Sequence, residues 1–361
     1  MPSSNVYPRA FATIGVVLTG VAVALGMWLF RGREVKPSSN RETVSAEVDP
    51  DTKAGATSVL GRQKIPSAAK LIFMGPGEDG YPELTPSQLE AYVVQEGRSA
   101  ASLLTAFVLS NGEASWLREA AERYPENPRV SATMLMRGSE LGGGSKEWIR
   151  RMQENDPKNS LGWYQAALTA FKNGNSDDAL DALQSAVSRG RPSQYHEEFS
   201  REVSKAYRSA GYEALQAESL GASRMEGQHF SLLVELATLV SAEPAFARGP
   251  AGKEMLDLAE KLRTSTGRGM VMDRMAATMI DSHLLSQFEL SDDVPGTGVF
   301  TIEQLEKGRY ESSEIMALVE RCKRLMPKLS DTEVKQFLRR MSIEGEVKAM
   351  EWVVQTHTAV K

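Results

Sequence analysis

The sequence has little cysteine and no excess of positive charge. The first argues against disulfides and thiolate metal sites, and the second against a general attraction for nucleic acid. A single cysteine, Cys322, rules out an intramolecular disulfide and a zinc site built from several thiolates. The 42 basic residues are outnumbered by 47 acidic ones, and with a net charge of −5 no overall positive field attracts nucleic acid. Because Cys322 lies among Leu318, Val319 and Leu325, we predict a buried thiol rather than a nucleophile.

Recognisable catalytic and ligand-binding motifs are also missing. No H-E-x-x-H or G-x-S-x-G sequence occurs, and no second histidine or cysteine stands at ligand spacing from any of the histidines, which are His196, His229, His283 and His357. Residues 138–146, GSELGGGSK, have Gly144 where a phosphate-binding loop needs its lysine, so we interpret them as a loop between helices. The sequence therefore predicts no catalytic residue, no cofactor and no metal, and we expect the protein not to be an enzyme.

Charge is absent from one long stretch near the amino end, residues 11–30, FATIGVVLTGVAVALGMWLF. As a helix this stretch matches the roughly 30 Å hydrocarbon core of a bilayer, and Tyr7 and Trp28 lie near its ends, where aromatic rings favour the interface. We predict an uncleaved transmembrane helix within an anchor at residues 1–36, and hence a single-pass membrane protein. The alternative is a cleaved signal peptide, whose apolar region normally runs about 7–15 residues.

The side of the membrane stays open. Arg31, Arg33 and Lys36 follow the span and only Arg9 precedes it, which favours a cytoplasmic body, yet short amino-terminal anchors often export the domain behind them. Small residues at four-residue spacing in the span, such as Gly20 and Ala24, could instead seat a second membrane helix, so self-association is a further possibility. Residues 37–64 lack apolar periodicity, and we predict a flexible linker.

The most informative stretch is residues 157–192, which predicts two paired helices. Five apolar residues at i, i+3, i+4, i+7 and i+8 form a stripe on the first helix, namely Trp163, Ala166, Ala167, Ala170 and Phe171. Turn residues at 173–175 end it, and we expect Ser176 to cap the second helix. That helix carries Ala179, Leu180, Leu183, Ala186 and Val187 on one face, and Gly190 ends it.

These residues resemble a tetratricopeptide repeat. They match the motif at its first aromatic, its turn glycine and the two small residues of its second helix, which are Trp163, Gly174, Ala179 and Ala186. The family's Leu-Gly pair is replaced by Ala166-Ala167. The resemblance implies a solenoid of helix pairs that offers a concave surface to protein partners. One clear repeat matches, at about residues 157–192.

The rest of the body is predicted to be all-α. Pro125, Pro157 and Pro192 are 32 and 35 residues apart, close to the repeat length of about 34 residues, so we assign residues 65–224 to repeats of this kind. Thr85-Pro86 opens a helix, and helix pairs are expected at 99–109 with 114–124 and at 130–136 with 146–152. Residues 225–361 are expected to form a helical carboxyl-terminal section, which either continues the solenoid or caps it, with a short helix after Thr301 and others at about 312–326, 330–342 and 344–357.

The leading functional hypothesis is a membrane-tethered scaffold that binds an unknown protein partner and no nucleic acid. We look for its binding face around Tyr164, Lys172, Tyr195 and Tyr207, with Trp163 expected in the core. The methionine-rich run at 270–279 is either a core contact or an adaptable groove. The alternative hypothesis is an enzyme whose site assembles from dispersed residues of the carboxyl-terminal section, and a purely structural role is a third.

Overall fold

The computed structural model describes residues 67–72, 81–138, 145–190, 192–193, 195–224, 228–264, 270–289, 291–296, 298–299 and 301–358. All of them belong to the unit formed by residues 67–73 and 81–361. The predicted membrane helix at 11–30, the linker at 37–64 and the glycine-rich loop around 142–144 lie outside the described residues. Within the described ranges, no helix combines the length and apolar character needed to span a bilayer.

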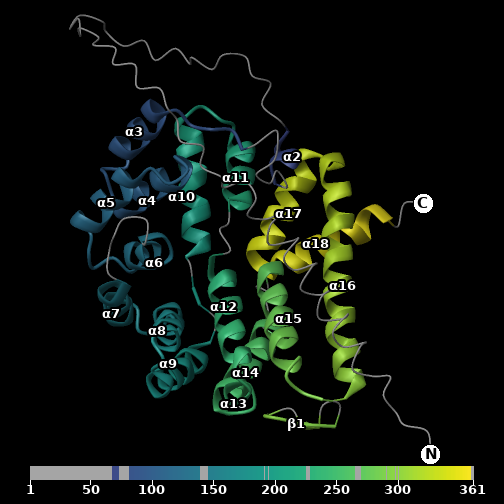
Figure 1. Ribbon diagram of the computed structural model, residues 1–361. Helices are drawn as coiled ribbons and strands as arrows, with labels where there is room; N and C mark the ends of the chain where they lie inside the picture. The colour runs from purple at the N-terminus through teal and green to yellow at the C-terminus, as the bar shows by residue number, and fades with distance from the viewer. Residues whose placement is uncertain are drawn as a thin grey trace, which may run out of the picture. The chain divides into compact units, whose positions relative to one another are not determined.

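The described structure is all-helical apart from one short hairpin, as predicted. Its first part contains the helices α2 (Ala68–Ile72), α3 (Pro86–Gln95), α4 (Ala100–Leu109), α5 (Ala114–Arg123), α6 (Pro128–Arg137), α7 (Ser145–Asn155), α8 (Leu161–Lys172), α9 (Ser176–Arg189), α10 (His196–Ser209) and α11 (Ala214–Ser223) (Figure 1). From α4 onward they pack as consecutive hairpins, α4 with α5, α6 with α7, α8 with α9 and α10 with α11. The predicted helix pairs are therefore present.

Local capping explains where several of these helices begin. The Thr85 hydroxyl accepts a hydrogen bond from the Gln88 amide, and the Gln88 side chain accepts one from the Thr85 amide, which is a capping box ahead of Pro86. Ser99 caps α4 through the Ser102 amide. The prediction for α9 was wrong by one residue: Ser176 is the first helical residue, and Asn175 is the N-cap without a side-chain hydrogen bond.

The pair α8–α9 also shows how far an apolar stripe predicts burial. On α9 the predicted face is confirmed, because Ala179, Leu183, Ala186 and Val187 are buried. On α8 the predicted stripe is confirmed only in part: Ala167 is buried, and Trp163 and Phe171 pack partly buried against the core. Leu161, Tyr164 and Leu168, outside the stripe, are buried as well. The reason is that α8 contacts α6, α7, α9 and α12, so its core face is wider than one stripe.

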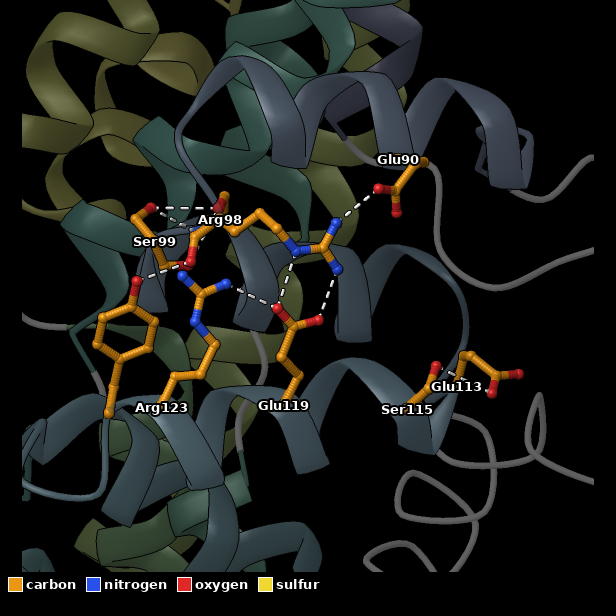
Figure 2. A network of polar contacts seen from close by, with 9 residues as sticks. Glu90, Arg98, Ser99, Glu113, Ser115, Glu119 and Arg123 are labelled. Atoms are coloured by element: carbon orange, nitrogen blue, oxygen red, sulfur yellow. Dashed lines mark hydrogen bonds and ion pairs between the residues drawn. The ribbon is translucent and has the colours of Figure 1, made fainter.

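An arginine ties the first hairpin to the helix before it. Arg98, with a positive φ of 50°, lies between Glu90 and Glu119 (Figure 2). Its Nε donates to Glu119 Oε1 at 2.8 Å and its Nη2 donates to Oε2 at 2.5 Å. Arg123 donates to the same carboxylate at 2.9 Å, and the Tyr124 hydroxyl donates to the Arg98 carbonyl at 2.8 Å. These bonds fix the tight turn between α3 and α4.

The second part of the body contains α12 (Gln228–Ala242), α13 (Pro244–Ala247), α14 (Pro250–Thr264), α15 (Val271–Leu285), β1 (Asp293–Val294), β2 (Gly298–Val299), α16 (Ile302–Leu325), the 3-10 turn η3 (Met326–Lys328), α17 (Asp331–Glu344) and α18 (Glu346–Thr358). The strands pair antiparallel, with Val294 opposite Gly298. The predicted break near residue 310 is wrong, since α16 runs unbroken for 24 residues. No proline interrupts it, and a single interior glycine, Gly308, costs only about 1 kcal/mol.

The apolar core runs across both parts of the body. One cluster of buried residues joins α8 and α9 to α12, α14 and α15, with Leu183, Leu236 and Met255 among its members. A second joins α2 to α16, α17 and α18, and it contains Cys322. Cys322 is fully buried, and burial raises the pKa of its thiol to about 12, which confirms the predicted core thiol.

Helix α10 departs from the nearest-neighbour packing of a regular solenoid. In such arrays each repeat contacts only the next. Here α10 packs against α3 and α4, which are separated from it in the chain by α5 and the hairpins α6–α7 and α8–α9, and α12 packs against α8. The surfaces of α4 and α8 are thus partly covered by α10 and α12 of the same chain. A cavity of about 70 Å³ lies between α4, α6, α8 and α10, bordered by Leu104, Met136 and Phe199.

Candidate binding groove

The four residues of the predicted binding face do not share one surface. Tyr164 and Tyr207 are fully buried. The Tyr164 hydroxyl donates to the Gly190 carbonyl at 3.3 Å, and the Tyr207 hydroxyl donates to the Pro82 carbonyl at 2.7 Å. Burial raises the pKa of both phenols. Both side chains therefore support the core, and neither is available to a partner in this structure.

Tyr195 and Lys172 reach the surface but make separate contacts within the fold. The half-buried Tyr195 donates its hydroxyl to Asp156 Oδ2 at 2.6 Å and precedes α10 with a φ of 56°. Lys172 Nζ lies 2.7 Å from Glu235 Oε1, an exposed ion pair between α8 and α12. Trp163 packs against the core, as predicted, with the Arg189 guanidinium over its ring at 4.1 Å.

A larger groove, which Tyr195 of the predicted face also borders, has α10 and α17 as its walls. It has a volume of about 920 Å³, within the range of ligand-binding clefts. On α10 its lining follows one helical face, with Glu197, Arg201, Lys205 and Arg208 at spacings of four, four and three. On α17 the groove is bordered by Lys335 and Arg339, which are four residues apart and therefore lie on the same face of the helix. Ala222 of α11 also borders the groove, which therefore combines the hairpins with the carboxyl-terminal helices.

The floor of the groove is formed by polar side chains that make hydrogen bonds within the protein. His229 Nε2 lies 3.2 Å from Asp273 Oδ1, and each of these two side chains is only 3% exposed. The second oxygen of Asp273 accepts from the Met270 amide at 3.4 Å, and Glu346 Oε2 accepts from the Val271 amide at 2.8 Å. Two carboxylates thus satisfy the amino end of α15, where the helix dipole favours negative charge. Burial nevertheless raises the pKa of Glu346.

The cations along the walls fall into two groups. Lys205 is paired with Glu96 and Glu202 at 3.3 and 3.0 Å, and Arg208 is paired with Glu218. The second group consists of Arg201, Lys335 and Arg339, which are exposed. Across the described part of the chain, the structure records no ion pair or hydrogen bond for these three side chains.

The histidine, acidic and methionine side chains that border the groove belong to separate arrangements. Among the described residues, no three histidine, cysteine or acidic side chains are placed to hold a metal ion. The His229–Asp273 pair resembles part of a catalytic arrangement, but with each side chain only 3% exposed it offers a substrate little of the imidazole. The methionine run is divided, since Met270 borders the groove whereas Met275 packs on the second apolar cluster.

Sequence reasoning missed most of the groove, for a physical reason. The cationic faces of α10 and α17 are visible as spacings of three and four residues, but nothing local indicates that the two helices face each other. His229 and Asp273 are 44 residues apart and carry no motif.

No protein-family model matches the sequence, and no curated protein and no solved structure is significantly similar to it.

Proposed function

We propose that this protein is a membrane-tethered helical scaffold whose α10–α17 groove binds a segment of another protein. The observation that carries the proposal is the groove itself, about 920 Å³ in volume and bordered by residues of α10, α11, α12, α15, α17 and α18. Its walls are exposed and charged, while its floor is held by hydrogen bonds within the fold. Such an arrangement offers a preformed surface for a ligand without the accessible reactive groups of a catalytic site.

The proposed tether rests on the sequence. The uncharged stretch at 11–30 is long enough to cross a bilayer as a helix, and residues 37–64 would let the body stand away from the membrane. We propose a single-pass localisation with the body on either side of the membrane. We also propose that the hairpins α4 to α9 are degenerate tetratricopeptide-like repeats, supported by their order and by the residues of the clear repeat at 157–192.

The groove replaces the binding face first expected around the four predicted residues. In a regular solenoid the concave side is open to a partner. Here α10 and α12 cover α4 and α8, so the scaffold would use the surface that α10 turns away from the hairpins. The enzymatic alternative has one supporting observation, the His229–Asp273 pair in the carboxyl-terminal half, and its burial makes it the weaker proposal.

Site-specific photocrosslinking in the full chain tests the proposal. A photoreactive residue at Ser342, which is exposed in the groove, is expected to give one defined protein adduct in native membranes. The matched control position is Ser188, an exposed serine of α9 outside the groove. Filling the groove by Ser200→Trp should abolish the Ser342 adduct. Equal adducts at both positions, or none at Ser342, would contradict binding in the groove.

A further inference from the structure

The groove has spare positive charge on both walls although the chain as a whole is acidic. Its net charge is −5, yet Arg201 of α10 and Lys335 and Arg339 of α17 are exposed and border the groove from opposite sides. Unlike Lys205 and Arg208, they have no carboxylate partner recorded in the described residues. These three cations lie on two helices and have no counter-charge recorded within the described ranges. They form a positively charged surface that is suited to an anionic ligand.

Most carboxylates that border the groove cannot neutralise these cations, because the fold already engages them. Glu218 is paired with Arg208, Asp273 with His229 and the Met270 amide, and Glu346 with the Val271 amide. Two further carboxylates, Glu197 and Glu198, lie in the first turn of α10, where the helix dipole favours them. Along α10 the groove therefore has two carboxylates at the helix start and, about one turn later, one exposed cation without a partner recorded in the described part of the chain, Arg201.

Apolar side chains interrupt the charges. Leu338 and Met341 of α17 border the groove while packing, half-buried, on the second apolar cluster, and Ala222 of α11 lies opposite in the lining. Peptide-binding surfaces combine such apolar positions, which supply affinity, with a charged rim, which supplies selectivity and speed of association. A single phosphate or carboxylate ion would fill only a small part of about 920 Å³.

We propose that the groove recognises an acidic protein segment, whose carboxylates pair with Arg201, Lys335 and Arg339 while an apolar side chain rests on Leu338 and Met341. This inference rests on the proposed function and adds the chemical class of the partner. The order of these charges along α10 also sets an orientation: the acidic part of the segment lies beyond Arg201, away from Glu197 and Glu198.

The test measures binding of labelled peptides to the full chain in detergent micelles by fluorescence anisotropy. The probe is a peptide of about twelve residues that alternates glutamate with leucine, and its control carries glutamine in place of glutamate. We expect the glutamate peptide to bind at least about tenfold more tightly, and we expect that preference to shrink as NaCl rises from about 50 to about 500 mM.

Charge reversal locates the site. The triple variant Arg201→Glu, Lys335→Glu and Arg339→Glu should lose the preference for the acidic peptide. The matched control, Arg118→Glu, Lys158→Glu and Lys328→Glu, changes the net charge equally at exposed positions outside the groove and should keep it. Equal effects of both triples, or equal binding of both peptides, would overturn the inference. If the Ser342 adduct persists in that case, the groove still binds a protein segment and only its acidic selectivity is refuted; if the adduct is also absent, the proposed function fails as well.

Discussion

Asn159 pairs with both backbone groups of Ser193, 34 residues later in the chain. Its Oδ1 accepts from the Ser193 amide at 3.0 Å and its Nδ2 donates to the Ser193 carbonyl at 2.8 Å. The same Oδ1 accepts from the Leu161 amide at 3.1 Å at the start of α8. The buried Asn159 side chain thus connects the start of the α8–α9 hairpin to the segment that leads into α10.

Replacing Asn159 should therefore destabilise the body. Asn159→Ala removes these bonds and leaves the amide of the buried Leu161 and both backbone groups of Ser193 without this partner, so we expect a loss of about 1–3 kcal/mol in the free energy of unfolding. Urea denaturation followed by circular dichroism measures it. The control is Asn175→Ala at an exposed N-cap without a side-chain hydrogen bond, which should change stability by less than about 0.5 kcal/mol. Equal losses in both variants would refute the role given to Asn159.

The crossing of α10 and α11 depends on Gly221. A Cβ at this position would lie 2.3 Å from the Ser200 carbonyl oxygen and 2.3 Å from Ser204 Oγ. Since backbone cannot yield as a flexible side chain can, Gly221→Ala should push the helices apart and cost about 2–4 kcal/mol. In the contrasting variant Gly162→Ala the nearest atom is Met152 Cγ at 3.0 Å, and we expect a loss below about 1 kcal/mol. Thermal unfolding of both variants measures whether Gly221→Ala is destabilised more than Gly162→Ala. A Gly221→Ala variant as stable as the wild type would contradict the close crossing of α10 and α11.

The Arg98–Glu119 pair should make stability depend on pH in the acid range. Hydrogen bonds from Arg98, with those from Arg123, lower the pKa of Glu119 to about 2 from its ordinary value of 4.5. A carboxyl with a depressed folded-state pKa stabilises the fold above pH 4.5, and this contribution is lost as pH falls toward 2. Because both side chains are partly exposed, we expect only about 1–2 kcal/mol.

The measurement is the free energy of unfolding of the wild type and of Glu119→Gln at pH 7 and at about pH 3. The difference between the two proteins should be largest at pH 7 and should shrink at low pH. Glu154→Gln is the control, since Glu154 is exposed and makes only an ion pair within α7. A difference that does not change with pH would show that Glu119 acts through packing rather than charge.

The thiol of Cys322 should be inert in the folded protein. Its complete burial and its pKa of about 12 leave almost no accessible thiolate at neutral pH. We expect an aromatic disulfide reagent to label Cys322 only at the rate of unfolding, and to label it fully in denaturant. Rapid labelling under native conditions would mean that α16 and α18 open locally far more often than the buried cluster implies.

The hairpins could be predicted because their signals are local. The Thr85 capping box, the glycine turns and the apolar face of α9 each lie within a few residues, and each determines a boundary or a face. The stripe on α8 was misjudged because burial there depends on four other helices. The groove brings together residues of α10, α12, α15 and α17, which lie far apart in the sequence, and no motif indicates that they border one site.

Helix α2 connects the amino end of the body to α11 and α17. It packs against α11 and α17, and Ala68, Ala69 and Ile72 belong to the same apolar cluster as Val334 and Phe337 of α17. Tension applied through the chain ahead of residue 67 would therefore be delivered first to α11 and α17, and only afterwards to the hairpins α4 to α9. Extracting α2 would remove support from α17, one wall of the groove, so a pulling force on this end is expected to change the shape of the proposed binding site.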